Sequence, residues 1–153
     1  QSLDDAVSDA EMLLATGYLQ VGNWNLAQVL GHCNDWLRFP MVGYPNSPLL
    51  MRWVLWCVKI SLGRSMLNKI TRERRFKPGT ATLPETVKSS TTTQDAAQLE
   101  EFKKTVHEFN AFKGKLQPSP LFGALSYEEC RALQIIHVQH HLSFLVPAFS
   151  DND

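Results

Sequence analysis

The sequence predicts an all-α fold, a four-helix bundle with one additional helix, formed by residues 1–153 as a single domain. Three observations predict it. Apolar residues recur at intervals of three and four along five segments, the period of helices that bury one face. Loops rich in proline, glycine and polar residues separate these segments, and none alternates as a strand does. A chain of 153 residues is also long enough to bury a substantial core.

The first two helices are predicted from their caps and breakers. The first is expected from about Ser2 to Thr16, with the Ser2 hydroxyl as its N-cap. The second is expected to begin at Asn23 or Asn25, either of which is a favourable N-cap. It is expected to end before Pro40, because proline lacks the amide that continues a helix.

The third helix is predicted from about Pro48 to Arg75, after a proline-containing loop. Its start, which includes Trp53 and Trp56, is apolar nearly all round, so we expect it to be deeply buried. Its apolar run is too short to cross a bilayer, so no membrane association is expected. We interpret the basic run 72–77 as a solvated helix end, where cations favour the helix dipole.

The last two helices follow a long polar segment, residues 77–93, which should be either functional or mobile. The fourth helix is expected from about Gln94 to Gly114. The fifth is expected from Ser126 to about Leu145, since Ser126 and Glu129 have the spacing of a capping box.

Charge and cysteine content exclude several classes of protein. Lysine and arginine balance aspartate and glutamate at 15 each, so no general electrostatic attraction to nucleic acid is expected. Cys33, Cys57 and Cys130 contain no CxxC pair, which suits a reducing compartment or simple burial, and Cys33 is expected in the core. Localisation stays open between the cytoplasm and export, because the chain starts at Gln1 and a removed signal peptide would not be visible.

The histidines are the most informative residues. His137 and His141 are four residues apart on the last helix, so they share one face. Such a pair suits either a metal ligand pair or two histidines that are packed, hydrogen-bonded or exposed. His32, on the second helix, supplies a third imidazole if the two helices meet. Three protein ligands with an open position are typical of a reactive metal site.

The other candidate residues are given weaker roles. His140 is expected at the rim of such a site, as a proton carrier. His107 lies among charged residues and is expected to be exposed; Asp35 either orients an imidazole or is a surface charge. The tryptophans are interpreted as core and loop packing. There is no G-x-S-x-G turn, P-loop, GxGxxG or HExxH motif, which disfavours the enzyme classes that depend on them.

Two segments carry a resemblance to a known family. Residues 22–32, GNWNLAQVLGH, resemble the opening of the second helix in the DinB-like superfamily. Residues 120–129, PLFGALSYEE, followed by residues 137–145, HVQHHLSFL, are similar to an uncharacterised branch that bears only a domain-of-unknown-function label. The resemblance extends from about Gly22 to Leu145.

The resemblance implies a DinB-type bundle of bacterial origin, and often a homodimer. It implies a divalent metal bound by His32, His137 and His141, for which zinc or nickel is our expectation. It further implies a transferase or isomerase that uses a low-molecular-weight thiol such as bacillithiol or mycothiol. Ser119 stands where this branch often has a histidine, so no ligand is expected from that loop.

Two functions follow from these patterns. The first is a metal-dependent, transferase-like enzyme that acts on an unknown small molecule through the three-histidine site. The second is a non-catalytic helical module without metal, whose histidines pack or hydrogen-bond and whose apolar faces dimerise.

Overall fold

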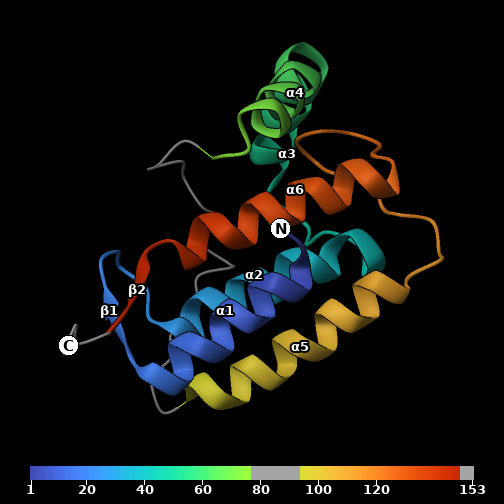
Figure 1. Cartoon of the computed structure of the whole chain (residues 1–153). Coiled ribbons are helices and arrows are strands. Elements are labelled where there is room, and N and C mark those ends of the chain that lie inside the picture. Colours follow the sequence, from blue (N-terminus) through green and yellow to red (C-terminus); the bar gives the residue numbers. More distant parts are fainter. Residues whose placement is uncertain (77–93, 149–153) are drawn as a thin grey trace.

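Four helices lie side by side and form the body of the protein (Figure 1). The computed structural model describes residues 1–76 and 94–148, so the predicted polar segment 77–93 lies outside the described residues. The body helices are α1 (Leu3–Thr16), α2 (Leu26–Val42), α5 (Asp95–Ala111) and α6 (Tyr127–Leu142). The remaining elements are α3 (Leu49–Val58), the π-helical turn η1 (Lys59–Gly63), α4 (Arg64–Glu73), and the strands β1 (Tyr18–Gln20) and β2 (Leu145–Pro147). The all-α class is therefore confirmed.

Three of the body helices begin with a reciprocal capping box. The side chains of Ser2, Asn25 and Ser126 each accept a hydrogen bond from the backbone amide three residues later, and that residue's side chain accepts one from the backbone amide of the cap. Each box satisfies two backbone amides that a helix start leaves without a partner. The caps predicted at Ser2 and Ser126 are confirmed, and of the two candidates for α2 it is Asn25 that caps the helix.

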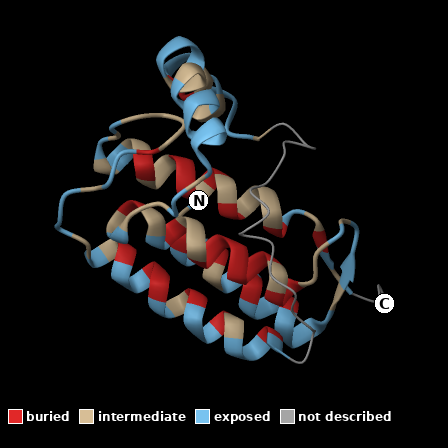
Figure 2. Ribbon diagram, turned by 180° about the vertical axis from the view of Figure 1, so that it is seen from behind, coloured by how far each residue is buried: buried red, intermediate tan, exposed pale blue. Residues whose placement is uncertain are grey.

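The core lies between the body helices, where the buried residues face inward (Figure 2). At its edge, the buried carboxylate of Asp95 fixes the start of α2. It accepts hydrogen bonds from the Ala27 amide at 2.8 Å and the Tyr18 hydroxyl at 2.9 Å. The Tyr18 hydroxyl in turn accepts one from the Leu26 amide at 3.0 Å. A carboxylate at a helix N-terminus is also favoured by the helix dipole, so this network sets the position of α2 on α5.

The second helix does not end before Pro40, as predicted, but continues through it to Val42. Proline at this position leaves the carbonyl of Trp36, one turn earlier, without its helical donor. Gln134 of α6 supplies the missing hydrogen bond, from its Nε2 to the Trp36 carbonyl at 2.9 Å. The helix can therefore accommodate the proline because a neighbouring helix satisfies the carbonyl that it leaves free.

Residues 49–73 form a helical arm outside the four-helix body; it consists of α3, η1 and α4, and its α4 contacts α6 (Figure 1). The prediction that this helix is deeply buried was wrong. No residue of α3 is buried, and Trp53 and Trp56 are 63% and 51% exposed. An apolar sequence predicts that a helix will seek a partner surface, but the core cluster of the described residues forms among the other elements and contains no residue of α3.

A short antiparallel sheet was not predicted. Tyr18 pairs with Pro147 and Gln20 with Leu145, so β1 and β2 close one end of the body. Strands of three residues are too short to display an alternating pattern. This pairing also explains why α6 ends at Leu142 instead of about Leu145. Within the described residues, no helix has both the length and the apolar character that a membrane crossing requires.

Candidate metal centre

Three imidazole rings from two helices meet at one point inside the body. His32 lies on α2, and His137 and His141 lie one turn apart on α6. The Nε2 atom of His137 is 3.2 Å from Nε2 of His32 and 3.1 Å from Nε2 of His141. One ligand atom from each ring lies within 4.8 Å of both others. The structure thus brings together all three residues that the sequence singled out, as a cluster that could hold a metal ion.

Hydrogen bonding alone does not account for this arrangement. A ring nitrogen carries either a proton or a lone pair, so Nε2 of His137 can make one good hydrogen bond to a neighbouring imidazole, not two. A cation, in contrast, accepts lone pairs from all three nitrogens at once. At a zinc–nitrogen distance of about 2.0–2.1 Å in tetrahedral geometry, neighbouring nitrogens lie about 3.3–3.4 Å apart. The observed separations of 3.1 and 3.2 Å are close to that value.

The surroundings keep the imidazoles of His137 and His141 neutral. Burial lowers the pKa of His137 well below its ordinary value, and its histidine neighbours lower it further. Burial, followed by the effect of His32, lowers the pKa of His141 to about 3. The His32 side chain is itself only 1% exposed. Neutral imidazoles present the lone pairs that a metal requires, so the environment favours the ligand form.

Aromatic rings hold the cluster in place. The indole of Trp24 stacks on His141, with ring centroids 5.2 Å apart and an interplanar angle of 15°. Trp36 lies 5.5 Å from His137, and Phe76 lies 5.6 Å from the same ring. These contacts fix the imidazole orientations without supplying a competing ligand atom. The tryptophan interpretation was therefore incomplete: Trp24 and Trp36 pack on the candidate centre itself.

The cluster opens onto a cavity of about 230 Å³. Its walls come from α2, α3, α6, Phe76 and the loop 119–122, and most of them are apolar or aromatic. Its polar groups include His140, Tyr44 and Ser119. Burial raises the pKa of Tyr44, so its phenol is neutral at physiological pH. The cavity therefore has a largely apolar lining with a few polar groups beside the imidazoles. This combination is typical of a binding site for a small molecule.

Ser119, from which no ligand was expected, has a structural role. Its hydroxyl accepts hydrogen bonds from the amides of Leu121 and Phe122, at 3.3 and 3.2 Å. Its backbone also pairs with Gly123, whose φ is +78°. The serine shapes the loop that walls the cavity, and it is not one of the clustered ligands.

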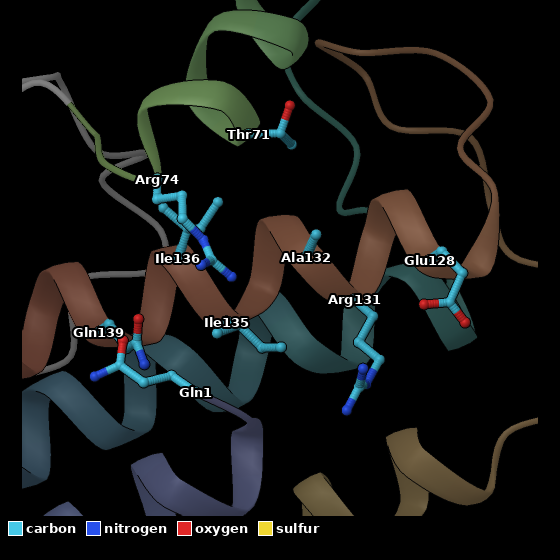
Figure 3. Close-up of a pocket in the computed structure, with 9 residues that line it drawn as sticks. All are labelled: Gln1, Thr71, Arg74, Glu128, Arg131, Ala132, Ile135, Ile136 and Gln139. Carbon is cyan, nitrogen blue, oxygen red and sulfur yellow. The ribbon is translucent and has the colours of Figure 1, made fainter.

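A second cavity, of about 300 Å³, lies between α4 and α6 and contains none of the histidines (Figure 3). Thr71 on α4 and Arg74, which follows α4, line one side of it, and Arg131 and Ile135 line the other side from α6. It is larger than the cavity at the imidazoles, but it has no convergent ligand set. The chemistry of the side chains therefore places the candidate centre in the other cavity.

The remaining predicted residues have varied positions. His107 is exposed on α5, as predicted, and takes no part in the cluster. Cys33 is fully buried, and burial raises its pKa, which confirms it as a core thiol. Asp35 is half-buried on α2, and His140 lines the cavity. Tyr44 and Phe76 were not predicted as part of the site. The position of Trp36, one helical turn after His32, was a signal in the sequence that it would lie beside that ring.

The chain belongs to a family described as Protein of unknown function (DUF1569), whose model matches residues 1–148. A search of curated proteins and a search of solved structures give no match to this chain.

Proposed function

We propose that this member of the DUF1569 family is a divalent-metal-dependent enzyme that acts on a small molecule. His32, His137 and His141 would hold a divalent metal ion, zinc or nickel. The observation that carries the proposal is the convergence of three Nε2 atoms, two of them within 3.2 Å of the third. Three protein ligands leave a coordination position for water or substrate.

The resemblance to the DinB-like superfamily supports the same ligand set. It implies one histidine from the second helix and an HxxxH pair from the last, and those are the helices that meet here. It also implies transfer or isomerisation chemistry with a low-molecular-weight thiol. When bound, a divalent ion would supply Lewis acidity that lowers the pKa of a thiol or a water molecule.

The chain's own residues would bind and orient the substrate. The apolar and aromatic walls exclude water, which strengthens electrostatic interactions inside the cavity. Trp24 and Trp36 keep the imidazoles aligned through ring contacts. His140 lines the same cavity, and burial lowers its pKa, so its ring is neutral and would act as a relay for the proton that a thiol releases.

The alternative is a helical module whose histidines only pack or hydrogen-bond. It is disfavoured because Nε2 of His137 cannot make good hydrogen bonds to both neighbours. The alternative also includes dimerisation through apolar faces. Dimerisation is compatible with a metal site, and the exposed apolar residues of the arm favour it.

Metal analysis of the dialysed protein tests the metal half of the proposal. We expect roughly one zinc or nickel ion per chain after reconstitution, and loss of most of it in His141→Ala. His107→Ala is the matched control, because that histidine is exposed and outside the cluster. Less than about 0.2 equivalents of metal in the wild-type protein, or unchanged affinity in His141→Ala, would contradict the proposal.

A cobalt-substituted protein tests the open position. Addition of 2-mercaptoethanol should produce a sulfur-to-cobalt charge-transfer band in the wild-type protein, since a thiolate would occupy the fourth position. The protein could bind cobalt, show no such band, and give no accelerated addition of a thiol to an electrophile. That result would refute the proposed enzymatic activity and leave a metal-binding module.

A further inference from the structure

The arm presents a row of large apolar side chains that the described part of the chain leaves uncovered. Leu49, Trp53, Trp56 and Ile60 are 81%, 63%, 51% and 62% exposed. We call these four residues the arm seam. Leu50 and Leu62, elsewhere on the arm, are also more than half exposed, at 74% and 54%.

The exposed apolar area of the arm is too large for an ordinary monomer surface. Together with Met51 and Val54, these side chains leave on the order of 1,000 Å² uncovered around the arm, whereas the largest apolar patch on a typical monomer is about 300–600 Å². The arm seam, which lies on one face, accounts for roughly 600 Å² of this, so two copies of it would bury about 1,200 Å², the lower end of the range of standard protein interfaces. It is therefore enough to support one stable protein–protein contact.

The spacing of the arm seam is that of a helix which pairs with another helix. Its members follow one another at intervals of four, three and four residues, which puts them on one stripe of the arm. The nearby cations border this stripe. Arg52 lies one helical turn from both Leu49 and Trp56, so its side chain flanks the stripe at one edge. The methylene groups of Lys59 lie beside Gly123, on the side of the arm that faces the cavity loop.

We propose that the arm seam is an isologous interface between two copies of this chain. A two-fold axis would set the arm of one protomer against the arm of its partner, so that one surface covers the other. Two features favour a second copy over a lipid surface. Two copies of the seam would together bury about 1,200 Å², which is enough for a standard dimer, and apolar side chains such as Leu50, Val54 and Leu62 are exposed outside the seam too. A helix lying on a membrane has instead one apolar and one strongly polar face.

The proposed dimer interface does not depend on the proposed metal centre, so evidence against either proposal does not affect the other. The arm nevertheless contributes Leu55 to the wall of the cavity beside the imidazoles. A dimer that holds the arm in place would therefore also hold one wall of that cavity.

Sedimentation of the full chain at several concentrations tests the interface. We expect a species of about twice 17.3 kDa that dissociates in the double variant Trp53→Gln/Ile60→Gln. The matched control is Val21→Gln, because Val21 is 69% exposed but lies near β1. Circular dichroism should show that all three proteins retain their helices.

A measurement on the wild-type protein keeps the test valid if the double variant does not fold. Acrylamide quenching of tryptophan fluorescence should rise on dilution from about 100 μM to about 0.1 μM, because dissociation would expose Trp53 and Trp56. A monomer at every concentration would overturn the proposal, and so would a dimer that the double variant leaves intact. A monomer that binds vesicles containing phosphatidylglycerol would also overturn it, and would assign the arm to a lipid surface.

Discussion

At the scale of single residues, His137 is central to the candidate site. Its Nε2 atom is the one that lies close to both other imidazoles. Its other ring nitrogen, Nδ1, is buried and has no hydrogen-bond partner within residues 1–76 and 94–148. The three ligand positions were predictable from the sequence because HxxxH fixes two rings on one helical face. The rings that pack on them were not, because tryptophan at helical spacing equally predicts core packing.

The three cysteines should differ sharply in reactivity. Burial raises the pKa of Cys33 and raises that of Cys130 to about 11, so both thiols stay protonated and inaccessible at pH 8. We expect at most one thiol, that of the partly exposed Cys57, to react with a disulfide reagent in the native protein, and all three after denaturation.

Cys57→Ser is the control for this experiment, and it should abolish the native reaction. Rapid native reaction of two or more thiols would show that the packing around Cys33 or Cys130 is looser than described.

At the scale of secondary-structure elements, the contact between α2 and α6 determines whether His32 can meet the pair on α6. Most helix starts were predictable, because caps are local signals in the sequence. The continuation of α2 through Pro40 was not, because it depends on Gln134 from α6, 94 positions further along the chain. The exposure of α3 was unpredictable for a related reason: an apolar helix does not specify whether its partner lies in the same molecule.

Gln134→Leu should destabilise the protein by about 1–3 kcal/mol, since it leaves the Trp36 carbonyl without a donor. Much of that loss should disappear in a Pro40→Ala background, where residue 40 regains the amide that serves this carbonyl. Urea unfolding of the two single variants and the double variant measures the coupling. Strictly additive effects would show that the two residues do not share the Trp36 carbonyl.

At the scale of the whole molecule, the body brings its two histidine-bearing helices together and leaves its arm exposed. The all-α class could be predicted from hydrophobic period, but the β1–β2 pair could not, because three-residue strands carry no pattern. A ligand that binds the native state alone must raise the stability of the entire body. The unfolding temperature therefore reports on the site even though the site involves only α2 and α6.

Zinc or nickel should raise the midpoint of thermal unfolding. At a free concentration about 100 times the dissociation constant, one site adds about 2.7 kcal/mol of stability. For a chain of this length that corresponds to a rise of about 5–10 °C. His32→Ala should remove the rise, whereas His107→Ala should keep it. An equal rise in all three proteins would indicate binding elsewhere on the chain.

The most direct test is an anomalous difference map from crystals of the full chain grown with zinc, measured on both sides of the zinc absorption edge. A single strong peak about 2.0–2.2 Å from the Nε2 atoms of His32, His137 and His141 is predicted. The absence of a peak there, in crystals that show zinc at other positions, would contradict the metal centre and leave three imidazoles that only pack together.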